Sequence, residues 1–324
     1  MRRKGNLYKN IYKLENIQTI FNEVCRNTKN KRKVGIFREY KASYISRIHD
    51  ILINKSYTPA PYNVFTIYEP KERRIVSQPM QDKVINHLVS RYILYPAIIP
   101  CLIDANVASR INMGTSKGLL YTYKFNNICK IKYNTYYILK CDISKFFASI
   151  DHDILKAKLK RKIKDKDALD IVFTIIDSDK NGLSIGNMSS QALAIFFLND
   201  LDHYIKEQLK IKYYVRYQDD FLLFHQSKHY LKECLEKIKI FLSKEKLTLN
   251  KKTRLYKCTD NFIFLGRNKF GKYAKYRSVN RKLKKRKHLY YTSKIPLSSL
   301  LDSMLSYKHL EEISHLWFWL YNQD

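Results

Sequence analysis

The chain has 324 residues, of which 45% are hydrophobic and 14% aromatic, and its formal net charge at pH 7 is +32. This apolar content can build a core and excludes intrinsic disorder as the main state. So large an excess of lysine and arginine favours a polyanionic partner, either nucleic acid or an anionic membrane. The polar start of the chain and the absence of an apolar run of about 18 residues argue against the membrane.

The length of the chain limits the number of domains, and the cysteines indicate the redox compartment. A chain of 324 residues fits two domains, or one domain with subdomains. Its six cysteines are scattered and include no Cys-x-x-Cys pair, which favours reduced thiols over a disulfide framework or a zinc ribbon. We therefore expect a cytoplasmic protein that does not associate with a membrane.

The N-terminal part of the chain predicts helices and one hairpin. Apolar residues recur at helical spacing through much of residues 1–60. Residues 62–68 are β-branched and aromatic and predict a strand. A polar, basic turn at 69–74 connects this strand to a second short strand at 75–76, and a helix is expected over 82–98.

The remainder of the chain mixes apolar strands with amphipathic helices. Asp151 is a suitable N-cap for one of these helices. The predicted strands are 136–141, the two hairpin arms 213–216 and 221–224, and 261–266; the predicted helices are 151–164, 190–210, 230–246, a basic helix at 281–287 and apolar helices over 297–320.

Two acidic sites stand out in this basic chain. Asp142 follows the strand expected at 136–141, and Asp219 and Asp220 lie between two apolar hairpin arms. Carboxylate oxygens are hard ligands of the kind that Mg²⁺ prefers. Two Mg²⁺ ions about 3.5–4 Å apart can activate a hydroxyl and stabilise the leaving group of an in-line displacement. Aspartates are also common in ordinary turns, so the Asp-Asp pair alone leaves both interpretations open.

The surroundings of these acids resemble the sequence motifs of reverse transcriptases. Six landmarks follow one another in the order typical of that family and cover about residues 60–270. They are the basic fingers hairpin with its following helix (71–87), motif A (Lys-Cys-Asp-Ile-Ser-Lys-Phe-Phe, 140–147), motif B (182–191), motif C (Tyr-Gln-Asp-Asp, 217–220), motif D (249–253) and motif E (264–266).

The resemblance implies an α+β architecture, the right-hand polymerase fold with fingers, palm and a small helical thumb. The palm would combine an antiparallel sheet with helices. Residues 1–135 would form the fingers, interleaved with the start of the palm. Residues 136–275 would form the palm with motifs A to E, and residues 276–324 the thumb.

The same resemblance assigns roles to the acids. Asp142 and Asp219 would coordinate two Mg²⁺ ions directly, for which Mn²⁺ can substitute, and Asp220 would be the third acid of the metal site and support them. Lys252 matches the motif D lysine that protonates the leaving pyrophosphate, and Lys251 is an equal contender on spacing.

Other residues match substrate-binding positions of the family. Phe147 corresponds to the bulky steric gate that leaves no room for a 2′-hydroxyl and so favours dNTPs; the alternative is a core aromatic, as expected for Phe146. Lys71, Arg74 and Arg110 match basic positions that grip the incoming triphosphate. The segment around Arg110 has diverged from the family pattern, which weakens its assignment.

Motif B narrows the resemblance. Ile185 stands before Gly186 where reverse transcriptases usually carry Gln in Pro-Gln-Gly, and Gln191 ends the following Gly-x-x-x-Ser-Gln. These three substrate-binding positions resemble the reverse transcriptases of diversity-generating retroelements, whose errors fall at adenine. Replacing Gln with Ile185 would remove a polar contact near the nascent base pair, although simple packing also explains an isoleucine there.

The resemblance therefore predicts an RNA-directed DNA polymerase, most similar to the error-prone enzyme of a diversity-generating retroelement. A phage-defence reverse transcriptase with another template or priming mode is the alternative, and a non-catalytic RNA-binding scaffold is a third hypothesis. The expected partners are template RNA, the RNA–DNA hybrid, dNTPs, a structured noncoding RNA and a ring of an accessory variability protein. Three intact acids argue against the scaffold.

Overall fold

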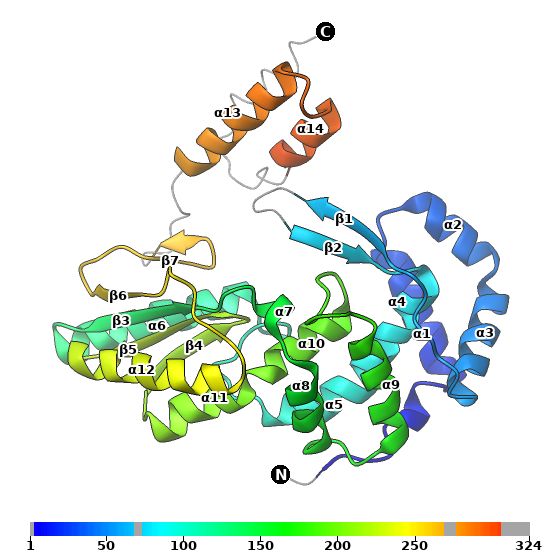
Figure 1. Ribbon diagram of the computed structural model, residues 1–324, viewed down its shortest axis with the longest axis horizontal. Helices are drawn as coiled ribbons and strands as arrows, with labels where there is room; N and C mark the ends of the chain where they lie inside the picture. The colour runs from blue at the N-terminus through cyan, green and yellow to red at the C-terminus, as the bar shows by residue number, and fades with distance from the viewer. Residues whose placement is uncertain (1–2, 68–72, 269–276, 306–324) are drawn as a thin grey trace. The chain divides into compact units, whose positions relative to one another are not determined.

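The computed structural model describes residues 3–67, 73–268 and 277–305 (Figure 1). The chain divides into two units, one made of Met1–Phe65 with Ile75–Gly271 and the other of Thr66–Arg74 with Lys272–Asp324. Of the basic turn predicted at 69–74, residues 69–72 lie outside the described part of the chain, and so do the predicted helical residues 306–320. Residues 73 and 74 belong to the second strand of the hairpin, which starts earlier than predicted.

A four-stranded antiparallel sheet with the strand order β4-β5-β3-β6 forms the centre of the larger unit. The strand and the hairpin arms predicted from the sequence are confirmed, whereas β6 was not predicted. Its two outer residues are basic and exposed and its two inner residues are only partly buried, so no buried run marks it. The strands are β3 (Tyr137–Asp142), β4 (Tyr213–Tyr217), β5 (Asp220–His225) and β6 (Arg254–Lys257).

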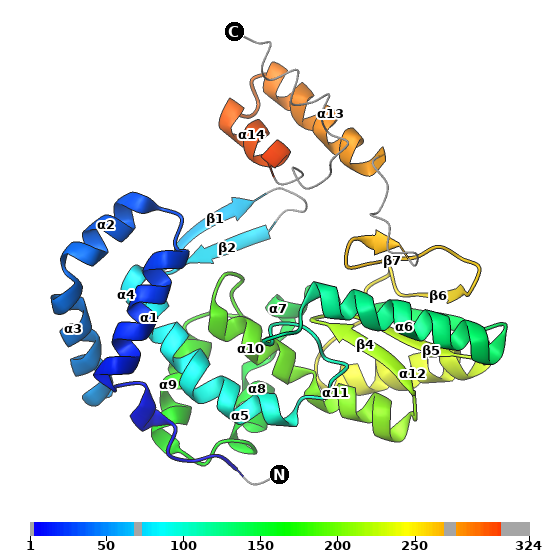
Figure 2. The ribbon, with the colours of Figure 1, turned by 180° about the vertical axis from the view of Figure 1, so that it is seen from behind.

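Two helices cover opposite faces of this sheet, as Figures 1 and 2 show: α12 (Lys228–Lys244) and α6 (Thr115–Tyr133). Because successive strand residues point to opposite faces, each strand contributes to two cores. Leu139 and Leu223 share a buried cluster with Ile238 of α12. Ile138 and Leu222 share the other cluster with Cys129 of α6.

Helix α6 was not predicted, because its apolar residues form no single stripe. Leu120 and Ile131 are exposed while Cys129 is buried, so the helical period is obscured. Helix α9 (Lys166–Asp177) was also missed, although Asp165 caps it by accepting a 3.1 Å hydrogen bond from the Ala168 N–H.

The helices predicted within residues 1–60 are confirmed. The helix predicted over 82–98 is present but interrupted: a π-helical turn at Ser90–Leu94 separates its two parts. Pro96 explains the wide turn, because its ring clashes with the carbonyl four residues earlier in a regular helix. The helices are α1 (Leu14–Asn27), α2 (Lys31–Glu39), α3 (Lys41–Ile53), α4 (Met80–Val89) and α5 (Tyr95–Ile98).

Caps and breaks shift the boundaries of the remaining helices. The predicted cap Asp151 accepts a 3.0 Å hydrogen bond from the Ile154 N–H. The helix predicted over 190–210 breaks after Phe197 and ends in a π-helical turn at Tyr204–Gln208. The elements are α7 (Phe146–Ser149), α8 (His152–Lys160), α10 (Met188–Phe197) and α11 (Asn199–His203).

The short strands pair as two small sheets, and the smaller unit adds two helices. The strand predicted over 261–266 is shorter than expected, because only Ile263–Phe264 pairs. No described helix has the length and apolar character that a bilayer crossing requires. The elements are β1 (Asn63–Ile67) with β2 (Arg73–Ser77), β7 (Ile263–Phe264) with β8 (Arg267–Asn268), and α13 (Arg277–Tyr291) and α14 (Leu297–Leu305).

Candidate active site

Three acidic residues meet at one end of the central sheet. The antiparallel register of β3 and β5 pairs Asp142 with Asp220. Asp219 lies in the two-residue turn between β4 and β5. The carbonyl oxygen of Asp219 accepts a 3.2 Å hydrogen bond from the N–H of Ile143, which ties the turn to the residue after Asp142. The backbone therefore brings these acids together, as the sequence predicted.

The carboxylate of Asp220 forms an ion pair with Lys140, whose Nζ lies 2.7 Å from Oδ1 and 2.6 Å from Oδ2. Lys140 is opposite Leu222, so Asp220 is its diagonal neighbour on the same face of the sheet. Burial raises the pKa of Asp220 to about 6, although Lys140 opposes the rise. The charges of Asp142 and Asp219 add to it, so this end of the sheet favours a cation.

This donor set suits a divalent cation. Among the described residues, no three Asp, Glu, His or Cys side chains lie close enough together to form a metal cage from protein alone. Mg²⁺ does not need one, because it usually takes one or two carboxylates and completes its shell with water and substrate phosphates. Asp142 and Asp219 can supply those two carboxylates. Asp220 is engaged by Lys140, which agrees with a supporting role.

A buried ion pair supports the turn that carries Asp219. Arg216 and Asp202 have 0% side-chain exposure, and Arg216 Nε donates to Asp202 Oδ1 at 2.7 Å. A second nitrogen of Arg216 donates to the carbonyl of Gln218 at 2.9 Å, one residue before Asp219. Tyr214 also donates its hydroxyl to Asp202 at 2.7 Å. This network was not predicted from the sequence, where its only signal is an arginine inside an apolar strand.

Gln218 begins the turn with a φ of 53°, a conformation in which a residue other than glycine needs support. Its side-chain amide donates to the hydroxyl of Ser109 at 3.0 Å. Ser109 in turn donates to Gln191 at 3.2 Å. The turn that carries Asp219 is thus connected through one serine to the predicted substrate-binding residue of the motif B helix.

The motif B loop is fixed on both sides by backbone contacts. The N–H of Val76 in β2 donates to the carbonyl of Ile185 at 3.0 Å, and the N–H of Leu183 donates to the carbonyl of Phe147 at 2.7 Å. Gly186 has a φ of 128°, and a Cβ there would lie 2.5 Å from the Val76 oxygen. The loop therefore joins the first hairpin to the expected steric gate, and only glycine permits the approach.

Replacing Gly186 with alanine is expected to destabilise the protein by about 1–3 kcal/mol, because the new methyl group would clash with backbone at a φ that side chains avoid. The matched control is Gly35→Ala, since Gly35 lies within α2 and a methyl group there would meet no other atom within 4 Å. That substitution should stabilise by about 0.5–1 kcal/mol. Urea denaturation of both variants measures the difference, and equal stabilities would contradict the predicted clash.

Comparison with known proteins identifies the family. A family model described as reverse transcriptase (RNA-dependent DNA polymerase) matches residues 63–268, more than half of the chain. The protein belongs to the reverse transcriptase family. This family generally uses divalent metal ions, in agreement with the carboxylates at the end of the sheet. None of the curated protein sequences gives a significant match.

Two solved telomerases resemble this reverse transcriptase in fold. Apo telomerase from Candida tropicalis, truncated from its C-terminal domain, is 15% identical with a TM-score of 0.49, over 72% of this chain and 58% of that one. Telomerase from Candida albicans, in complex with a TWJ fragment of telomeric RNA, is 13% identical with a TM-score of 0.51, over 90% and 60%. The chain thus spans less than two thirds of either telomerase. The predicted right-hand polymerase fold is confirmed.

The other predicted substrate residues of the reverse transcriptase lie as follows. One guanidinium nitrogen of Arg110 donates to the carbonyls of Ile103 and Asn106, each at 2.8 Å, so Arg110 braces its own loop. Its remaining donors are those that a triphosphate could use.

Lys251 and Lys252 are both exposed, in a turn that the hydrogen bond from the Asn250 N–H to the Asp142 carbonyl holds beside β3. Lys71 and the side chain of Arg74 lie outside the described residues.

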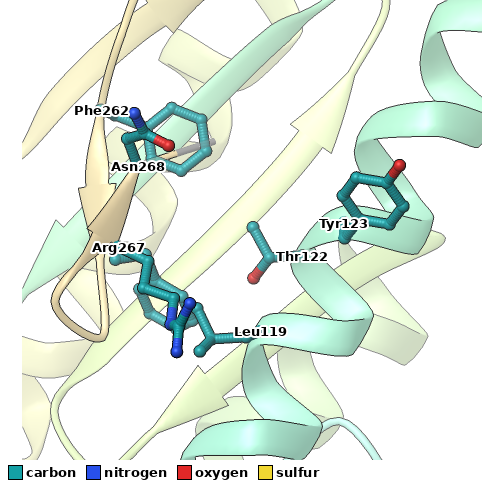
Figure 3. Close-up of a pocket in the computed structure, with 7 residues that line it drawn as sticks. Leu119, Thr122, Tyr123, Phe262, Arg267 and Asn268 are labelled. Atoms are coloured by element: carbon teal, nitrogen blue, oxygen red, sulfur yellow. The ribbon is translucent and has the colours of Figure 1, made fainter. Parts of the chain in front are cut away.

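A small pocket lies between α6 and the β7–β8 hairpin, the motif E segment of this reverse transcriptase (Figure 3). Thr122 and Tyr123 line it from the helix, and Arg267 and Asn268 line it from the hairpin. Its volume of about 30 Å³ admits one or two water molecules. The pocket is therefore too small for a nucleotide and reflects close packing of the helix on the hairpin.

Proposed function

We propose that this reverse transcriptase is an RNA-directed DNA polymerase that makes cDNA by extending a primer on an RNA template. The observation that carries the proposal is the register of β3 and β5, which places Asp142 opposite Asp220 and next to the Asp219 turn. Nothing in RNA binding alone favours three acids at one point of a chain whose net charge is +32.

In this proposal Asp142 and Asp219 hold two Mg²⁺ ions, with Mn²⁺ as a substitute. When bound, such ions supply charge neutralisation for the triphosphate and a lower pKa for the primer hydroxyl. Asp220, whose carboxylate is paired with Lys140, supports these two ligands from the neighbouring strand. Lys251 or Lys252 gives a proton to the leaving pyrophosphate, and the basic residues Lys71, Arg74 and Arg110 bind the incoming triphosphate.

Primer extension on an RNA template tests the activity. The protein should add dNTPs in the presence of Mg²⁺ or Mn²⁺, and removal of the metal with a chelator should stop the reaction reversibly. Parallel reactions on a DNA template of the same sequence measure the template preference. A protein that binds the primer–template and yet adds no nucleotide under any of these conditions would instead be the RNA-binding scaffold.

Phe147 is proposed as the steric gate. It is half-buried, follows the buried Phe146, and is held by the hydrogen bond from Leu183 to its carbonyl. Phe147→Ala should lower the preference for dNTPs over rNTPs by about tenfold or more, because the removed ring opens space for a 2′-hydroxyl. The ratio of kcat/KM for the two nucleotides measures this. Phe173→Ala, at another half-buried aromatic, should leave the ratio unchanged.

We assign the enzyme to the diversity-generating retroelement group on Ile185, Gly186 and Gln191. An aliphatic side chain at residue 185 offers no hydrogen bond to the nascent pair, which favours loose base selection. Sequencing of the cDNA should show an excess of errors opposite adenine, and Ile185→Gln should reduce it. Errors spread evenly over the four bases, or a product linked to protein, would favour the phage-defence alternative.

The partners proposed with this assignment are a structured noncoding RNA and a ring of an accessory variability protein in the cytoplasm. The charge of +32 supports the RNA directly, because each phosphate neutralised releases counterions. The affinity of the protein for RNA should therefore fall steeply as the salt concentration rises. Filter binding at several salt concentrations measures this dependence.

A further inference from the structure

A cleft of about 440 Å³ lies among the N-terminal helices, and none of its lining residues belongs to the candidate active site. Its volume is within the range of sites that hold small ligands. Helices α2 and α3 form one side, and the start of α4 forms another. The residues used below are Lys33, Phe37, Tyr44, Arg47, Met80 and Asp82.

One side of the cleft is aromatic and closely packed. Phe37 is 3% exposed and stacks on Phe21, with the ring centres 4.4 Å apart and the planes at 17°. Tyr44 packs against Phe37 at 4.3 Å and is itself half-buried. Tyr44 is therefore packed against Phe37 and still partly exposed, and it lines the cleft. Such a ring is a stacking platform for an unstacked base.

The cleft is also positively charged. Lys33 and Arg47 line it, and Lys83 lies close enough that the charge of Lys33, after burial, lowers its pKa. No ion pair within the described part of the chain involves any of these three residues. Asp82 is the one acid in the lining; it is 2% exposed, and its Oδ2 accepts a hydrogen bond from the Ala60 N–H at 3.0 Å. The cleft therefore selects an anionic ligand.

The element that lines the cleft also reaches the motif B helix. Helix α4 starts at the cleft, and its buried Asn86 accepts a 2.6 Å hydrogen bond from the hydroxyl of Ser189 in α10. Val76, four residues before Met80, is bonded to the Ile185 carbonyl. The cleft is thus connected, through α4 and the strand before it, to the loop where the template base pairs with the incoming nucleotide in the proposed function.

We propose that this cleft holds one unstacked nucleotide of the single-stranded template ahead of the primer end. Its base lies against Tyr44, and its phosphates lie near Lys33 and Arg47. A concave cleft of this size admits a single base and excludes a duplex, which is recognised instead by shape across its grooves. The proposal concerns binding and so does not depend on turnover.

An abasic scan tests the base contact. Binding is measured without dNTPs, by fluorescence anisotropy, on a primer–template whose RNA overhang is about ten nucleotides long, with one overhang base removed at a time. The wild type should lose about tenfold in affinity at one position, because stacking of a base has that worth. Tyr44→Leu keeps an apolar side chain in the lining of the cleft but has no ring. Removal of the base at that position should therefore cost this variant no affinity. A flat scan of the wild type would overturn the proposal.

A second template separates the cleft from a general defect in binding. Tyr44→Leu should bind the long overhang about tenfold more weakly than the wild type and bind a one-nucleotide overhang equally well. Equal weakening on both templates would overturn the proposal. Tyr123→Leu, at a tyrosine of α6 that is 54% exposed, is the matched control and should match the wild type on both. Circular dichroism confirms that each variant is folded.

The charges are tested by salt dependence. Lys33→Gln and Arg47→Gln should each reduce the slope of log K against log salt by about 0.7 on the long overhang, because each removes one phosphate contact on a single strand. Lys232→Gln, at an exposed lysine of α12, should leave the slope unchanged. Identical slopes for all three variants and the wild type would argue that no phosphate lies at the cleft.

Discussion

Asp219→Asn is expected to reduce primer extension on the order of 10³-fold or more while leaving the protein folded and able to bind RNA. Asparagine keeps the shape of the side chain and the turn, but it removes the negative charge that, in the proposed function, would hold a divalent cation at this end of the sheet. Nucleotidyl transfer depends almost entirely on positioning and charge neutralisation, so no other group compensates for the loss. Initial rates of dNTP incorporation at saturating template measure the effect.

Two comparisons make this result specific. Asp142→Asn should show a loss of the same size, because the two side chains act on one site. Asp170→Asn removes one negative charge from an exposed position of α9 and should keep the wild-type rate. Undiminished incorporation by Asp219→Asn would place the chemistry elsewhere in the molecule, and so would equal losses in all three variants.

Arg216→Met is expected to lower the free energy of unfolding by about 3–5 kcal/mol, because it leaves the carboxylate of Asp202 charged and unpaired in a fully buried position. The substitution also removes the donor to the Gln218 carbonyl. Because that carbonyl belongs to the turn before Asp219, turnover should fall by about 10–100-fold, as for other residues that hold a metal ligand in place. Urea denaturation and primer extension measure the two effects.

The double variant Arg216→Met with Asp202→Leu separates stability from positioning. Removing both charges leaves no unpaired ion, so most of the lost stability should return. Turnover should stay low, since methionine offers no hydrogen bond to Gln218. If turnover recovers together with stability, then Arg216 acts only on the fold and does not position the catalytic turn.

Local patterns predicted the elements in which one residue spacing dominates. The apolar strand before Asp142 and the hairpin around Asp219 were predicted because both faces of the sheet are covered, so that these strands are runs of consecutive apolar residues. Helix α6 and strand β6 were missed for the opposite reason. Leu120 and Ile131 expose apolar side chains on α6, and β6 lies at a partly exposed edge, so neither has a clear period.

The sequence likewise predicted some contacts of the candidate site and missed others. Order and spacing of the motifs predicted that Asp142 would meet Asp219, because an antiparallel hairpin and one neighbouring strand suffice to bring them together. The pairing of Lys140 with Asp220 follows from the strand register, which no local pattern specifies. Ser109 is separated by 82 residues from Gln191 and by 109 from Gln218, so its bridging position was invisible before folding.

The amino-acid order alone was sufficient to predict the family, since motif order and spacing are properties of the chain. It also singled out the candidate acids and, through the net charge, predicted a polyanionic partner. Only the tertiary structure shows that Lys140 pairs with Asp220 and that Arg216 and Asp202 form a buried ion pair. The cleft beside α4 is likewise visible only in the folded chain. These features depend on contacts between residues far apart in the chain. Burial makes such contacts important for stability, because a charged group removed from water costs free energy unless it is paired with an opposite charge.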